Sequence, residues 1–174
     1  ALPISLRIDS VPGGGTLTLS GVSVTAGQVV TAADISAGNL LFTPAVNANG
    51  AGYASVTFSV RDSSNAYDPA PNTLTINVTA VNDAPTDLSL SANTVAENAA
   101  NGTVVGTISG TDPDSGDTKA YSLTDSAGGR FAINSSTGVI TVADGSLLNY
   151  EAATSHNVTV RVTDSGGLTY DETF

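Results

Sequence analysis

The segment GTDPDSGD, residues 110–117, carries three carboxylates within six positions, at Asp112, Asp114 and Asp117. Two carboxylates about 5 Å apart repel each other by roughly 3 kcal/mol at an effective dielectric constant of about 20, so the group is unfavourable without a counter-ion. Calcium accepts about six to eight oxygen ligands in a flexible geometry, which suits carboxylates and carbonyls of a turn. The segment therefore indicates a calcium site. The alternative is a solvated turn, because Asp, Pro, Ser and Gly all favour turns.

Other site chemistries fit the residues poorly. Zinc would require Cys or several His, whereas the chain has no Cys and one imidazole, His156. The acidic loop is not an EF-hand, because Gly116 stands one position early and Leu123 occupies the place of the bidentate glutamate. No G-x-S-x-G motif is present, and the absence of Trp disfavours a glycoside-hydrolysing pocket. We therefore predict that the protein is not an enzyme.

Charge and composition exclude several partners. Sixteen acidic residues against five basic ones give a formal charge of −11, which disfavours binding to nucleic acid or to anionic membrane surfaces. No stretch approaches the roughly 18 apolar residues of a spanning helix, so no direct membrane insertion is expected. The absence of Cys rules out a disulfide framework. The negative charge instead attracts cations.

Alternating apolar and polar residues predict strands along the whole chain, because successive strand side chains face opposite sides of a sheet. No segment of a dozen residues shows a helical apolar stripe, so the fold class is all-β, with two sandwiches of Greek-key type. The alternating sets are Ile4/Leu6/Ile8, Leu17/Leu19, Val56/Phe58/Val60, Leu74/Ile76/Val78, Leu88/Leu90, Tyr121/Leu123, Phe131/Ile133, Ile140/Val142 and Val158/Val160/Val162.

A short connector separates two halves. In TAVNDAPTDL one strand ends near Val81 and another begins near Leu88, and Pro85 holds the residue before it extended. We therefore assign residues 1–81 to a first domain, 82–86 to a linker and 87–174 to a second domain.

Five motifs in the second half support a family resemblance: VAEN, TDPDSGD, FAINSSTGVITV, LLNYE and VRVTDSGGL, in this order. Over roughly residues 83–174 the chain resembles the cadherin-type repeats of large bacterial secreted adhesins. The first half is similar to a related bacterial repeat that precedes VNDAP in such proteins, through GTLTLSGVSVTAGQVV, LLFTPAVNANGAGYASVTFSV and NTLTINVTAVNDAP.

The resemblance implies calcium at the junction between repeats. Its ligands would be Asn82, Asp83, Asp112, Asp114 and Asp164. Asp117 either joins them or faces solvent.

The resemblance also implies weaker sites. A distal group for a following junction would consist of Glu97, Asn149 and Glu151, with Asn149 in place of the usual Asp. In the first half, Asp62 corresponds to Asp164 of the second half. The loop and linker residues that would bind calcium together with Asp62 are missing. We expect the distal site to be incomplete.

The resemblance implies an extracellular, bacterial structural repeat that calcium stiffens, supporting cell adhesion or biofilm attachment. Its partners would be neighbouring repeats, other copies of the adhesin or surface glycans. The alternatives are a glycan-binding or homophilic module, or an accessory domain of a secreted hydrolase. By comparison with the family both ends are expected to be cut: the first domain would lack its opening strands and their acidic loop, and the second would stop at Phe174 inside its final strand. Ala1–Ser5 does not fit the repeat and matches a translated sequencing-adapter end, so we expect it not to be native.

Overall fold

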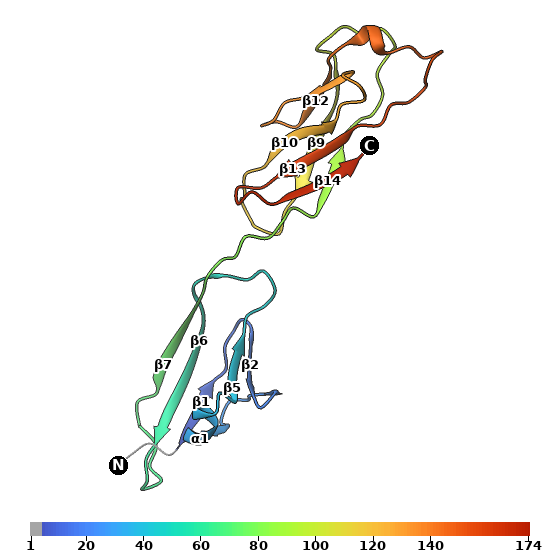
Figure 1. The fold of residues 1–174 in the computed structure, drawn as a ribbon. Coiled ribbons are helices and arrows are strands. Elements are labelled where there is room, and N and C mark those ends of the chain that lie inside the picture. The colour runs from blue at the N-terminus through green and yellow to red at the C-terminus, as the bar shows by residue number, and fades with distance from the viewer. Residues whose placement is uncertain (1–4) are drawn as a thin grey trace. The chain divides into compact units, whose positions relative to one another are not determined.

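The computed structural model describes residues 5–174, which form two compact units, residues 5–81 and 82–174. The regular structure of each unit is mostly antiparallel strands, arranged in two sheets and joined by turns and loops (Figure 1). The predicted all-β class with sandwich units is confirmed. The helical segments among the described residues span five and three residues, too short to cross a membrane.

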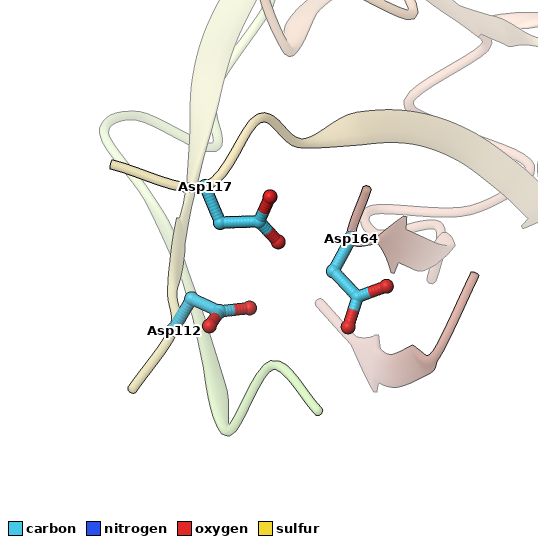
Figure 2. Close-up of side chains that lie close together, drawn as sticks. All are labelled: Asp112, Asp117 and Asp164. Atoms are coloured by element: carbon cyan, nitrogen blue, oxygen red, sulfur yellow. The ribbon is translucent and has the colours of Figure 1, made fainter. Parts of the chain in front are cut away.

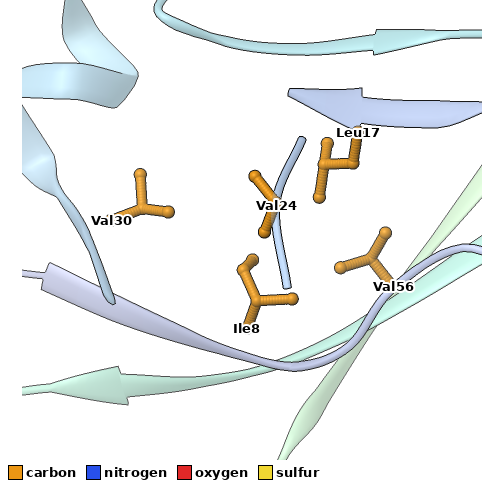
Figure 3. Packing of buried hydrophobic residues seen from close by; sticks show 5 residues of the cluster. All are labelled: Ile8, Leu17, Val24, Val30 and Val56. Carbon is orange, nitrogen blue, oxygen red and sulfur yellow. The ribbon is translucent and has the colours of Figure 1, made fainter. Parts of the chain in front are cut away.

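The first unit pairs a four-stranded sheet, ordered β4-β1-β6-β7, with a three-stranded sheet, ordered β3-β2-β5. Its elements are β1 (Ser5–Ser10), β2 (Thr16–Leu19), β3 (Val22–Ser23), β4 (Val29–Thr31), α1 (Ala32–Ser36), β5 (Leu40–Thr43), β6 (Gly50–Arg61) and β7 (Asn72–Val78). Side chains from both sheets and from the loop before β4 meet in its core (Figure 3), namely Ile8, Leu17, Val24, Val30 and Val56.

The short helix α1 was not expected from the apolar pattern, but its start has a local sequence signal. The Asp34 N–H donates to the Thr31 side chain, and the Thr31 N–H donates to the Asp34 carboxylate. This reciprocal capping box satisfies N–H groups that a helix start leaves without partners. A Thr-x-x-Asp signal thus defines a helix too short to show a 3.6-residue period.

The second unit pairs a four-stranded sheet, ordered β11-β12-β9-β8, with a three-stranded sheet, ordered β10-β13-β14. Its elements are β8 (Asp87–Leu90), β9 (Val104–Thr111), β10 (Ala120–Asp125), β11 (Phe131–Ile133), β12 (Val139–Val142), the 3₁₀ turn η1 (Gly145–Leu147), β13 (Thr159–Thr163) and β14 (Thr169–Thr173). Its core combines residues of both sheets: Leu88, Ile108, Ile140, Val160 and Val162.

The alternating sets predicted from sequence lie in strands, with two exceptions. Ile4 falls outside the described residues, and Val158 precedes β13, although it is buried on the same face. Strand β9 was missed because glycine occupies two of its inward positions, Gly106 and Gly110. A Cβ on Gly106 would lie 2.2 Å from the Ala92 carbonyl oxygen, so close backbone packing replaces an apolar side chain there.

Packing of the second unit can be tested with a core truncation. Ile140 is 2 % exposed, so we expect Ile140→Ala to lower the free energy of unfolding of this unit by about 2–5 kcal/mol. Val104, which is 60 % exposed on the neighbouring strand, provides the control: Val104→Ala should change it by less than about 0.5 kcal/mol. Denaturant unfolding followed by NMR separates the two units. Equal effects of the two substitutions would contradict the packing described.

Candidate metal centre

Two strands from opposite sheets, β9 and β13, are each followed by an aspartate at the same end of the second sandwich. On β13, Val160 and Val162 point inward and are fully buried, and Asp164 continues the same face one step beyond the strand. On β9, Gly106 and Ile108 are buried on the inward face, and Asp112 falls on that face just after the strand. Because strand side chains alternate with period two, both carboxylates are directed toward the interior of the sandwich end.

The loop between β9 and β10 returns a third carboxylate to the same place. The Asp114 N–H donates to Asp112 Oδ1 at 2.8 Å, and the Asp117 N–H donates to the Asp114 carbonyl oxygen at 3.3 Å. Gly116 permits this reversal with φ of +84°, a left-handed conformation that costs glycine little. The turn thus brings Asp117 back beside Asp112.

Asp112, Asp117 and Asp164 converge. One carboxylate oxygen from each lies within 4.8 Å of the others. Figure 2 shows Asp112 and Asp117 side by side on the loop, with both side chains extending toward Asp164 on the other sheet. We call these three residues the acidic triad.

The hydrogen bonds of the triad leave a buried oxygen without a donor. Asp164 is 6 % exposed; its Oδ1 accepts from the Leu168 N–H at 2.7 Å and its Oδ2 from the Asn82 amide at 2.8 Å. In contrast, Asp112 Oδ2 is buried and has no hydrogen-bond partner. A buried carboxylate oxygen without a partner is costly, so this atom is suited to a cation.

Asp117 is held as an anion by its surroundings. Hydrogen bonds from Ser165, through its side chain and its backbone, lower the pKa of Asp117 below its ordinary value, and the Thr118 N–H and the Lys119 charge act in the same direction. The Ser165 N–H lies 3.1 Å from Asp117 Oδ2. Neither of the ion pairs between described residues involves the triad, so no Lys or Arg side chain contacts its carboxylates as an ion pair.

The start of the second unit is attached directly to these acids. The Asn82 amide donates to Asp164 Oδ2, and the Asp83 N–H donates to Asp114 Oδ2 at 2.7 Å. Gly166 provides the space for Asn82, since a Cβ there would lie 2.4 Å from the Asn82 side chain. The connector residues therefore depend on the carboxylates for their position.

The structure thus brings the predicted main-site residues into one region. Asp117, ranked below Asp114 from sequence, lies with Asp112 and Asp164 in the triad, and the carboxylate of Asp114 accepts a hydrogen bond from the Asp83 N–H. The available signal was Gly116, which marks the turn that returns the chain to Asp112.

The distal residues and Asp62 lie elsewhere. Glu97 accepts a hydrogen bond from the Tyr150 N–H at 3.1 Å, and Asn149 accepts from the Glu151 N–H at 3.0 Å, so these residues occupy adjacent loops. Asp62 in the first unit accepts from the N–H groups of Ser64 and Ala66. Within residues 5–174, the acidic triad is the one group of three potential metal ligands that converges.

Comparison with known proteins gives one match to a family. The family model described as the cadherin domain matches residues 92–173. This part of the second unit is therefore similar to a cadherin domain. The acidic triad lies within the matched residues, and Asn82 and Asp83 precede them. No curated protein matches the chain.

Solved structures show the same fold over both units. The chain is similar to chicken VE-cadherin EC1-2, with 21 % identity and a TM-score of 0.56 over 97 % of this chain and 81 % of that one. It is similar to mouse cadherin-23 EC22-24, with 23 % identity and a TM-score of 0.61 over 98 % of this chain, and it spans 50 % of that chain. It is also similar to Drosophila N-cadherin EC1-4, with 19 % identity and a TM-score of 0.61, over 98 % and 40 % of the two chains. At these identities the likeness concerns the fold.

A substitution at Gly166 tests the attachment of the connector. In Gly166→Ala the new methyl group should displace the Asn82 amide from Asp164, and the lost charge-assisted hydrogen bond should lower the free energy of unfolding of the second unit by about 1–3 kcal/mol. The side-chain NH₂ resonances of Asn82, followed by NMR, should shift toward those of a solvated amide. Gly13→Ala is the control, because a Cβ there meets nothing within 4 Å. Unchanged Asn82 resonances would show that Gly166 does not position the connector.

Proposed function

We propose that this protein is a calcium-stiffened structural repeat of an extracellular bacterial adhesin, supporting cell adhesion or biofilm attachment. The observation that carries the proposal is the acidic triad with its buried, unpartnered Asp112 oxygen. The similarity to the cadherin domain and the adhesin-like motifs supply the extracellular setting.

The donor set of the triad suits calcium. Asp112, Asp117 and Asp164 offer carboxylate oxygens, and no Cys is present in the chain. Oxygen-only ligands select hard cations, and calcium tolerates irregular geometry better than magnesium does. A bound divalent ion would supply the positive charge that the hydrogen bonds of the triad do not provide.

The side chains of the site have separate tasks in this proposal. Asp112, Asp117 and Asp164 hold the cation, and Asp114 orients the loop and the connector backbone. Asn82 attaches the chain that leaves the first unit, at Val81, to the same carboxylate that binds calcium. Relief of the repulsion among the acids therefore also restricts the connector.

Calcium binding at a single site contributes a modest free energy, and the contributions add over many repeats. Extracellular calcium-binding modules have dissociation constants of about 10⁻⁴–10⁻³ M. At calcium concentrations about ten times the dissociation constant, binding stabilises the folded state by roughly 1.4 kcal/mol per site. Many repeats in one polypeptide would then produce a stiff extender whose contacts are mainly with its neighbouring repeats.

The two alternative roles are a homophilic or glycan-binding module and an accessory domain of a secreted hydrolase. A spacer should show neither specific glycan binding nor self-association at micromolar concentration. Analytical ultracentrifugation and a glycan array, both with calcium present, separate these roles.

Neutralising one acid should have opposite effects with and without calcium. In EDTA, Asp112→Asn should raise the melting temperature of the second unit, because it removes repulsion and keeps the oxygen that accepts from Asp114. With millimolar calcium the same variant should be less stable than the native protein and should bind calcium about tenfold or more weakly by calorimetry. Small-angle scattering should show a narrower distribution of inter-unit distances on adding calcium to the native chain.

Asp87→Asn is the matched control, because Asp87 is an exposed aspartate of the same unit outside the triad. It should preserve the calcium response. A calcium response that is equally strong in Asp112→Asn would refute the site. A normal calcium response without any change in scattering would refute the stiffening role alone.

A further inference from the structure

Lys119 is the one lysine of the chain, and it follows the loop that carries Asp112 and Asp117 of the acidic triad. Its Nζ atom lies 3.5 Å from the backbone carbonyl oxygen of Asp117. Neither of the ion pairs between described residues includes Lys119. A positive charge therefore lies beside the acidic triad without pairing with its carboxylates.

The glycine at position 110 makes room for the lysine side chain next to the acids. A Cβ on Gly110 would lie 3.3 Å from Lys119 Cδ and 3.3 Å from Val162 Cγ2, so the apolar stem of the lysine packs over β9 at this residue. Gly110 and Asp112 share the inward face of β9, because strand side chains alternate with period two. The lysine stem therefore lies next to the position of Asp112, and its ammonium group lies next to Asp117.

The other basic side chains of the second unit have partners elsewhere. Arg161 and Asp171 pair through two hydrogen bonds of 2.7 Å on the outer face of the three-stranded sheet. Arg130 donates hydrogen bonds to two backbone carbonyl oxygens. Lys119 is thus the basic residue of this unit that is placed to act on the triad.

An ammonium group and a divalent cation are alternatives at the triad. The lysine ammonium is a point charge on a flexible four-carbon stem, so it can occupy more than one position. Asp112 Oδ2 is buried and has no hydrogen-bond partner, so it can accept a hydrogen bond from an ammonium group. Two cations at the same carboxylates repel each other, and the two groups therefore exclude each other there.

We propose that Lys119 sets the affinity of the acidic triad for calcium by competing with the ion for the carboxylates. In the absence of calcium, the ammonium group pairs with the triad and reduces the repulsion among Asp112, Asp117 and Asp164. Calcium binding displaces the ammonium group toward solvent, which lowers the affinity for the ion. This role of Lys119 rests on the proposed calcium site. It lets the second unit keep part of its stability when calcium is scarce.

Removal of the lysine charge should have opposite effects on calcium affinity and on stability without calcium. In Lys119→Met, which keeps an unbranched stem over Gly110, the dissociation constant for calcium measured by calorimetry should fall about fivefold. In EDTA the melting temperature of the second unit should fall below that of the native chain, because the triad loses its counter-charge. Both differences should shrink at about 1 M NaCl, where the screening length is about 3 Å.

The displacement of the lysine side chain can be followed by NMR. Because Lys119 is the one lysine, a chain with selectively ¹³C-labelled lysine gives a single set of side-chain signals. These signals should report a restricted side chain in EDTA and a mobile one after the addition of calcium. A side chain that is equally mobile under both conditions would contradict the displacement.

Arg161→Gln is the matched control, because it removes one positive charge from the same unit, and its partner Asp171 lies outside the triad. It should change the dissociation constant for calcium by less than about twofold. An unchanged affinity in Lys119→Met, an equal gain in both variants, or a lower affinity with a lower melting temperature would overturn the role of Lys119 and leave the calcium site standing. An absence of calcium binding by the native 174-residue chain would refute the proposed calcium site, and the role of Lys119 with it.

Discussion

The mutual repulsion of Asp112, Asp117 and Asp164 is the constraint on which the account depends. Their oxygens lie within 4.8 Å of one another at the end of a sandwich whose core holds them there. The strands cannot release the repulsion, because Asp112 and Asp164 continue the inward faces of β9 and β13. In the proposed function a divalent cation would resolve this conflict, and the stability of the protein would then depend on the calcium concentration around it.

The connector shares this constraint because it uses the same acids. Asn82 and Asp83 are hydrogen-bonded to Asp164 and Asp114, and Gly166 leaves room for Asn82. A change in the charge of these acids therefore changes the strength of the hydrogen bonds that hold the connector.

Much of this arrangement could be predicted from the sequence. Alternation in β1, β6 and β13 and the acidic loop were clear because period two and clustered Asp are local patterns. Strand β9 was hidden because Gly106 and Gly110 occupy inward positions, where contact between backbones replaces side-chain burial. The approach of Asp117 to Asp112 depends on a left-handed turn at Gly116 and on a hydrogen bond from Ser165 in the β13–β14 loop, which no local pattern encodes.

A crystal structure of the chain grown in millimolar calcium is the most direct measurement of the central claim. The account predicts an ion bonded to oxygens of Asp112, Asp117 and Asp164 at about 2.3–2.6 Å, including Asp112 Oδ2. A triad occupied only by water under these conditions, with Asp112 Oδ2 hydrogen-bonded to it, would contradict the account.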